Sequence, residues 1–138
     1  MYSRACAALL AVTLFGCTAR SASVPPNIRL GGSAAPPPPQ TALPGAPPRI
    51  VAAWFSGAQV RRGQTWSGRI VTTTNVASVE VRTNLFSIDV PRRGFGSFAF
   101  DLRVFDVPPI FLRAYRVRTI ARNSAGVQTE EDFPFRIR

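Results

Sequence analysis

The sequence predicts an all-β fold, a single seven-stranded β-sandwich within residues 49–138. Three observations predict it. Apolar and polar side chains alternate with a period of two, which is typical of a strand with one buried face. Gly, Pro and Asn punctuate the apolar runs at roughly ten-residue spacing. No ten-residue stretch has a 3.6-residue period, and 13 Pro and 10 Gly are too many for a helical bundle.

The alternation is clearest at 98–104, where Phe98 and Phe100 alternate with Ala99 and Asp101. The same pattern predicts strands at 79–83, 115–122 and 133–138. Further strands are expected at 50–55, 65–74 and 86–90. Turns are expected between them, at Gly57, Arg62-Gly63, Asn75, Asn84, 91–96, Pro108-Pro109 and 123–126. Seven short strands of this kind favour two facing sheets.

The run 115–126, which begins at Tyr115 and ends in the turn Asn-Ser-Ala-Gly, resembles the penultimate strand and turn of immunoglobulin-like and fibronectin type III-like domains. The resemblance implies that the Tyr115 ring is buried and that its hydroxyl bonds back to the chain. It also implies a buried core indole, for which Trp54 and Trp66 are both candidates. The disulfide of antibody domains is absent.

The N-terminus has the pattern of an export signal, assigned to residues 1–16. Residues 5–15 are apolar except for Thr13. This run is too short to span a bilayer, for which about 20 residues are needed, but it fits the apolar region of a signal peptide. We therefore expect the chain to be exported to the cell envelope.

The stretch Leu14-Phe15-Gly16-Cys17 resembles the lipobox of bacterial lipoproteins, although Phe15 departs from the usual pattern. The resemblance implies that Cys17 becomes the first mature residue and carries a diacylglycerol that anchors it to a membrane, as in outer-membrane or cell-surface lipoproteins. Ordinary signal-peptide cleavage just after Cys17 is the alternative, and it would release a soluble periplasmic or secreted protein.

Residues 17–48 are expected to form a disordered linker. Nine Pro occur between Thr18 and Pro48, interleaved with Gly, Ser, Ala and Thr. Proline lacks a backbone donor and interrupts both helix and sheet. As polyproline II, such a segment reaches at most roughly 90 Å. We expect it to hold the domain away from the membrane.

The ionisable residues argue against an enzyme. All 17 basic residues are Arg, and the chain has no His and no Lys. Nucleophilic catalysis usually needs such a base beside the nucleophile, so a hydrolytic triad is excluded. Asp101, Asp106 and the run 130–132 are expected on the solvated surface, and none has calcium-loop spacing. The sequence predicts no catalytic residue, no cofactor and no metal.

Arginines are the remaining functional signal. Three are expected to project from one face of the strand at 115–122, and two pairs lie at turns, namely Arg116, Arg118 and Arg122, with Arg61-Arg62 and Arg92-Arg93. Guanidinium groups bind carboxylates, sulfates and phosphates through paired hydrogen bonds. The partner is expected to be a protein or an anionic glycan. Nucleic acid is disfavoured because the aromatics alternate inward. The alternative is that these arginines only keep the sheet soluble.

Two functions follow from these residues. The first is a lipid-anchored envelope protein that presents an immunoglobulin-like binding or assembly module without catalysis. The second is a soluble exported protein that binds polyanions, such as anionic glycan, lipid or nucleic acid, through its arginine-rich face.

Overall fold

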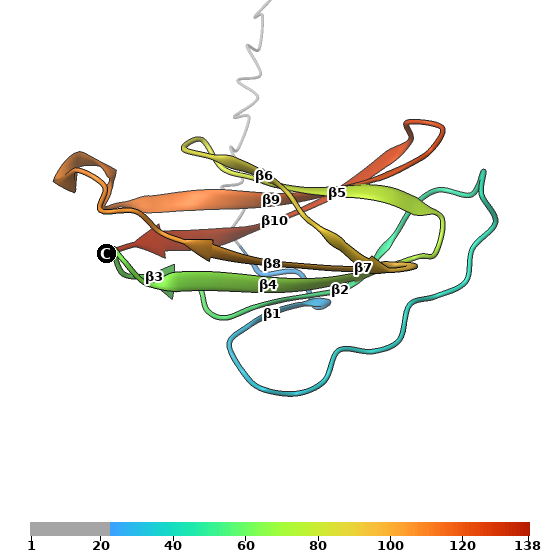
Figure 1. The fold of residues 1–138 in the computed structure, drawn as a ribbon, viewed down its shortest axis with the longest axis horizontal. Helices are drawn as coiled ribbons and strands as arrows, with labels where there is room; N and C mark the ends of the chain where they lie inside the picture. The colour runs from blue at the N-terminus through green and yellow to red at the C-terminus, as the bar shows by residue number, and fades with distance from the viewer. Residues whose placement is uncertain (1–22) are drawn as a thin grey trace, which may run out of the picture.

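The computed structural model describes residues 23–138, and in that range it contains ten strands in two five-stranded sheets (Figure 1). In spatial order, the first sheet consists of β1 (Ile28–Leu30), β2 (Ile50–Phe55), β4 (Thr65–Thr72), β8 (Ser97–Arg103) and β7 (Arg92–Gly94). The second consists of β3 (Gln59–Val60), β10 (Gln128–Ile137), β9 (Ala114–Asn123), β5 (Val76–Arg82) and β6 (Ser87–Asp89). A 3-10 helix, η1 (Pro109–Phe111), lies between β8 and β9.

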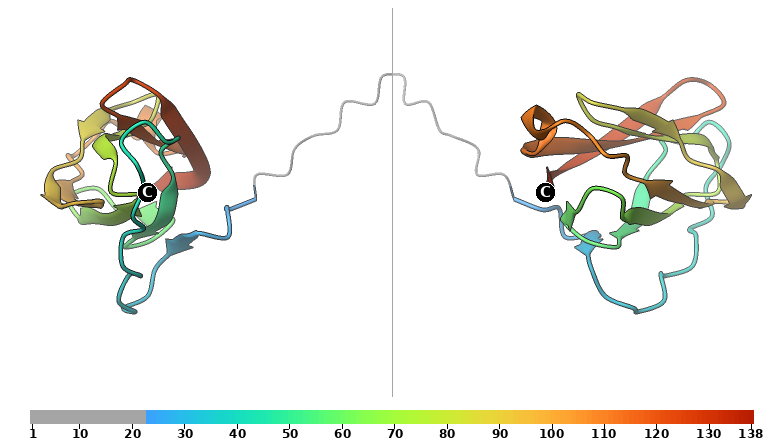
Figure 2. Two further views of the ribbon diagram at one scale, coloured as in Figure 1. Left: turned by 90° about the vertical axis from the view of Figure 1, so that its right-hand side faces the viewer. Right: turned by 60° about the vertical axis from the view of Figure 1, so that its left-hand side comes forward.

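The predicted all-β fold is confirmed, and two facing sheets are consistent with a β-sandwich (Figure 2). The strand count is corrected from seven to ten. All seven predicted strands occur, the one at 50–55 with the predicted bounds and the other six with shifted ends, and the three strands that were not predicted are β1, β3 and β7. Each of these has only two or three residues, which is too short for a period of two to be recognised.

Aromatic rings from both sheets fill the space between them. Trp66 of β4 is fully buried, and its indole Nε1 donates to the carbonyl of Gly57 at 3.1 Å. Its ring centroid lies 4.5 Å from that of Phe135 on the opposite sheet, and Phe55 lies 4.6 Å from Phe133 in the same way. Trp66 is therefore the core indole, with its one polar group satisfied.

Trp54 lies on the outer face of β2 instead. It is only partly buried, and the guanidinium of Arg29 from the neighbouring strand β1 lies 4.8 Å from its ring centroid. Residues 31–49 pass along this side of the first sheet and return the chain to the start of β2 (Figures 1 and 2). Of the two candidate core indoles, Trp54 is thus the one that the structure excludes.

The predicted disordered linker at 17–48 is wrong in its C-terminal part. β1 adds to the first sheet in parallel with β2, with Ile28 opposite Ala53, and Gln40 forms a bridge with Thr73. The side chain of Asn27 donates to the carbonyl of Ile50 at 2.9 Å. These contacts are possible because the prolines flank Ile28–Leu30 without interrupting it.

The same asparagine also joins the two sheets. Its Nδ2 donates to both carboxylate oxygens of Glu131 on β10, at 2.7 and 2.8 Å. Burial raises the pKa of Glu131, whereas the hydrogen bond from Asn27 acts in the opposite direction. The signal peptide expected at 1–16 and the lipidation expected at Cys17 lie outside the described residues.

Tyr115 lies near the start of β9 with its ring buried. Its hydroxyl donates to the carbonyl of Phe111 at 2.8 Å, which is the contact that the resemblance implies. Because Phe111 ends the 3-10 helix, this bond attaches the loop between β8 and β9 to the sheet.

Candidate anion-binding surface

An open hollow of about 670 Å³ lies over the outer face of the second sheet, where β5, β9 and β10 run side by side. Four arginines and a single acidic residue line it, together with small and polar groups. The lining residues are Arg82, Thr83, Asn84, Arg113, Ala114, Tyr115, Arg116, Arg118, Asp132 and Pro134. Such a lining favours an anion, because guanidinium donors outnumber the carboxylate within reach.

Alternation along β9 directs Arg116, Arg118 and Arg122 outward, since Tyr115, Val117 and the other odd-numbered residues are buried. Each of these arginines is paired with a carboxylate. Arg116 Nη2 lies 2.7 Å from Asp132 Oδ2, and Arg118 Nε lies 3.5 Å from Glu130 Oε2. The predicted arginine row is therefore a cross-strand ion-pair ladder rather than a bare cationic face.

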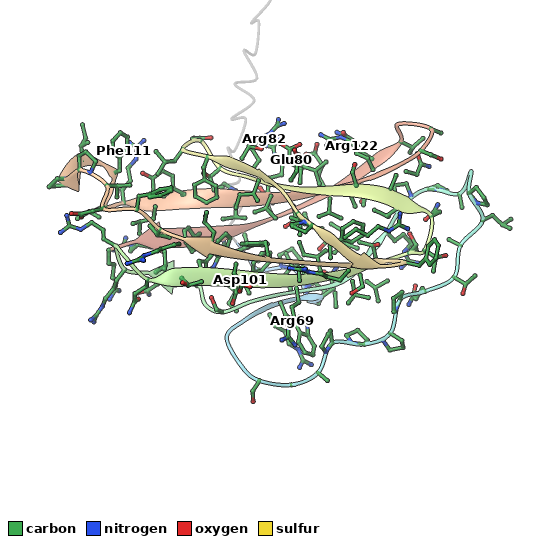
Figure 3. The ribbon with its side chains drawn as sticks, viewed as in Figure 1. Arg69, Glu80, Arg82, Asp101, Phe111 and Arg122 are labelled. Carbon is green, nitrogen blue, oxygen red and sulfur yellow. The ribbon has the colours of Figure 1, made fainter. Side chains whose placement is uncertain are left out.

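Glu80 lies at the Arg122 end of this ladder, where three side chains contact its carboxylate (Figure 3). It accepts from the hydroxyl of Ser87 at 2.6 Å and pairs with Arg82 at 2.6 Å and Arg122 at 3.0 Å. The Ser87 hydrogen bond, aided by the two guanidinium groups and opposed by burial, lowers the pKa of Glu80 to about 2. Glu80 remains ionised at neutral pH, so it holds Arg82 and Arg122 in place.

The charged side chains of this network pack over a buried residue, Ile120. It lies on the outer face of β9 between Arg118 and Arg122, yet it is only 1% exposed. Glu80 and Glu130 lie opposite it on the two neighbouring strands. The methylene stems of long charged side chains cover apolar surface well, so the ladder shields an isoleucine as well as pairing charges.

The predicted arginines fall into three separate groups. Arg116, Arg118 and Arg122 lie on β9, whereas Arg61 and Arg62 lie in the turn before β4, at one end of the sandwich. Arg62 pairs there with Asp106 at 3.1 Å.

The third group lies on β7, at the edge of the first sheet, where Arg92 and Arg93 are exposed. The guanidinium of Arg92 lies 4.8 Å from the ring centroid of Phe95. The structure does not bring these three groups together into one surface.

Two of the four arginines that line the hollow, Arg82 and Arg113, were not among the predicted site residues. Arg82 follows the outward alternation of the strand at 79–83, so that pattern contains the signal that would identify it. Arg113 lies in a loop and has no periodic signal. Its guanidinium lies 5.4 Å from the ring centroid of Tyr115, which holds it beside the hollow.

The first sheet offers smaller hollows beneath residues 31–49. One of about 430 Å³ includes Trp54, Arg69 and Asp101 in its lining, and Figure 3 shows the latter two on this sheet. A second, of about 370 Å³, lies between Trp54 and the prolines of the covering segment. Neither has the excess of guanidinium groups found over β9.

No protein-family model and no curated protein matches this chain. Among residues 23–138 there is no cluster of three acidic or other ligating side chains placed to hold a metal ion. In the same range no helix is long and apolar enough to cross a bilayer. Function has to be inferred from the residues themselves.

Proposed function

We propose that this protein is a lipid-anchored envelope protein that presents a non-catalytic, immunoglobulin-like module for binding an acidic partner, either a protein or an anionic glycan. The observation that carries the binding role is the hollow over β5, β9 and β10. Arg82, Arg113, Arg116 and Arg118 surround it, and Asp132 is its one acidic residue.

The ion pairs in the hollow leave donors for a ligand. Arg116 uses Nε and Nη2 on Asp132, and Arg118 approaches Glu130 only through Nε at 3.5 Å. Both arginine side chains are 53% exposed, and such exposed pairs contribute about 0–1 kcal/mol. An incoming sulfate or carboxylate therefore competes with weak pairs, and each guanidinium has five donors to share.

The order of the strands supports the immunoglobulin-like assignment. β2, β4, β8 and β7 form one sheet, and β10, β9, β5 and β6 form the other, with the short β3 parallel to β10 at its edge. Among these eight strands the chain therefore changes sheet three times, between β4 and β5, between β6 and β7 and between β8 and β9, as in a Greek-key sandwich. The Tyr115 hydroxyl bond to Phe111 is in accord with this assignment.

The place where the chain joins the sandwich bears on the anchor. Among the described residues, contacts with the domain begin at Asn27 and β1, and nine residues lie between Cys17 and Asn27. Fully extended, they span about 35 Å. A lipid on Cys17 would therefore hold the module closer to the membrane than a thirty-residue linker would.

Metabolic labelling tests the anchor. In bacteria that express the full chain, labelled palmitate should enter the wild-type protein and be absent from Cys17→Ala. Cys6→Ala is the matched control and should keep the label, because Cys6 lies within the predicted signal peptide. Equal absence of label from the wild type and both variants would reject the anchor while leaving the hollow untouched.

The alternative is a soluble exported polyanion-binding protein. The specific observation in its favour is the charge of the folded part, in which residues 23–138 hold 15 arginines and seven acidic residues. This function needs no lipid and no single partner, because long-range attraction to a polyanion depends on total charge.

Heparin binding separates the hollow from general charge. Arg113→Ala combined with Arg116→Ala should weaken binding of a heparin hexasaccharide about tenfold or more, since two bidentate contacts are lost. The control combines Arg69→Ala with Arg93→Ala, which removes the same charge from the other sheet. Equal losses in both double variants would favour the alternative, and no binding by the wild type would reject both.

A further inference from the structure

The end of the sandwich where β8 passes to β9 carries exposed apolar side chains. Phe105 is 77% exposed and Ile110 is 75% exposed, and both belong to the loop 104–113 that contains η1. Figures 1 and 2 show this loop projecting beyond the strands that it connects. Phe105 departs from the expectation that the aromatic side chains point inward.

Packing and hydrogen bonds hold this loop in one conformation. Val107 and Leu112 pack against the core, and the Tyr115 hydroxyl bonds the carbonyl of Phe111. Pro108 and Pro109 limit the backbone further. The exposure of Phe105 and Ile110 is therefore a fixed feature of the surface.

Part of the backbone of this loop is already hydrogen-bonded. The amides of residues 107, 111, 112 and 113 each donate to a carbonyl within the loop, at 2.9 to 3.0 Å. Pro108 and Pro109 have no amide hydrogen. The amides of Phe105, Asp106 and Ile110 have no such bond, so the loop suits the hydrated headgroup region of a membrane rather than its hydrocarbon interior.

Arginines gather at the same end of the molecule. The amide of Arg62 bonds the carbonyl of Arg138, and the amide of Gly63 bonds the carbonyl of Val104, which brings three segments together. Six exposed arginines occupy these segments, and among the described residues there Asp106 is the one acidic side chain. The arginines are Arg61, Arg62, Arg103, Arg113, Arg136 and Arg138.

We propose that this end of the sandwich docks on an anionic phospholipid surface, with Phe105 and Ile110 inserting between headgroups that the six arginines contact. The apolar part is a narrow projecting tip, whereas a stable protein interface covers about 800 Å² on each partner. Aromatic and aliphatic tips beside cationic side chains suit the membrane–water interface. The docking requires neither a lipid on Cys17 nor a ligand in the hollow.

Tryptophan fluorescence tests the insertion on the full chain. Phe105→Trp is mixed with vesicles of equal parts phosphatidylglycerol and phosphatidylcholine, some of which contain brominated acyl chains. Emission should shift to the blue and be quenched by the brominated lipid. Leu43→Trp is the matched control, because Leu43 is 79% exposed but lies in the segment 31–49. Its emission should not change.

Binding by sedimentation with the same vesicles gives the second measurement, made in a Cys17→Ala background so that no lipid on Cys17 contributes. Phe105→Ser combined with Ile110→Ser should weaken vesicle binding about tenfold or more, because the burial of both apolar side chains is lost. Leu43→Ser should bind as the wild type does. Pure phosphatidylcholine vesicles should bind at least tenfold more weakly than the anionic ones.

Three results would overturn the proposal. The first is unchanged Phe105→Trp emission on vesicles that sediment with the protein, and the second is equal quenching of Leu43→Trp. The third is wild-type protein that stays in the supernatant, which would leave the loop as a contact for a protein partner. Heparin binding through the hollow is measured without vesicles, so its outcome is independent of these.

Discussion

Gly68 occupies the centre of a row of three residues across the first sheet, opposite Phe55 on one side and Phe100 on the other. Both rings lean over the space that a side chain at this position would fill. A β-carbon there would clash with the Phe100 ring and lie 3.0 Å from Phe55. At this residue the absence of a side chain is what allows two aromatic rings to reach Trp66.

Gly68→Ala should therefore destabilise the protein by about 1–3 kcal/mol, because either the rings or the strand must move. Urea denaturation followed by the fluorescence of Trp66 measures the change. Gly94→Ala is the control, since nothing lies within 4 Å of its added methyl group and its backbone is not left-handed. Its effect should be within about 0.5 kcal/mol of zero.

Glu80 is a second residue whose burial is not expected from its outward position in the alternating pattern. It lies on the outer face of β5 and is only 6% exposed. Its low pKa means that the folded state favours the carboxylate more strongly than the unfolded chain does. The stability that it contributes is present above its ordinary pKa of about 4.5 and is lost as pH falls towards 2.

Glu80→Gln should lower stability at pH 7 by about 1–3 kcal/mol, since it leaves two guanidinium groups less well paired. The difference in free energy of unfolding between the variant and the wild type should become smaller as pH falls from 5 to 2. Urea denaturation at pH 7 and pH 3 tests this difference. Asp101→Asn, an exposed site on the other sheet, should show no such convergence. A gap that stays constant with pH would contradict the charge network.

At the scale of elements, β1 turns part of a proline-rich segment into an edge of the sandwich. Asn27 connects it to both sheets through the carbonyl of Ile50 and the carboxylate of Glu131. Ile28 is buried in the core, and Arg29 covers the ring of Trp54. In the proposed lipid-anchored protein, this strand would mark the end of the tether.

Asn27→Ala should loosen β1 while the other strands keep their pairing. Hydrogen exchange followed by mass spectrometry should show faster exchange at 28–30 and a loss of about 1 kcal/mol in overall stability. Asn84→Ala, at an exposed turn, should change neither the exchange rate at 28–30 nor the overall stability. Slow exchange at 28–30 in both variants would show that the asparagine is not what holds the strand.

How far the sequence predicts the elements depends on their length. The strands at 98–104 and 115–122 were predicted because four or more alternating residues reveal a period of two. β7 consists of Arg92, Arg93 and Gly94, all exposed, so it has no apolar residue to reveal it. β3 has two residues and pairs with β10 only through the folded arrangement.

The candidate site was predicted only in part, for a related reason. Outward alternation along β9 identified Arg116 and Arg118, but the pattern does not show which carboxylates lie beside them. Those partners, Asp132 and Glu130, come from β10, two residues away from the directly opposed positions. Pairing of this kind depends on strand register and twist, which one strand alone does not encode.

Across the whole molecule, charge and apolar surface are distributed unevenly. The hollow on the second sheet has guanidinium groups in excess of carboxylates, and the adjoining end has six arginines around Phe105 and Ile110. Arg113 borders both regions. The strands of the first sheet also carry more arginines than acidic residues, but these arginines are spread from β1 to β7 and residues 31–49 partly cover the sheet. The hollow and this end are therefore the two regions that we propose to contact partners.

The central claim is that the hollow over β9 is where an acidic partner binds. The most direct measurement is a titration of the full chain with a heparin hexasaccharide, followed by NMR of the arginine Nε–Hε groups. The largest shifts are predicted at Arg113, Arg116 and Arg118. Shifts confined to Arg69, Arg92 or Arg93, or spread evenly over all arginines, would contradict the claim.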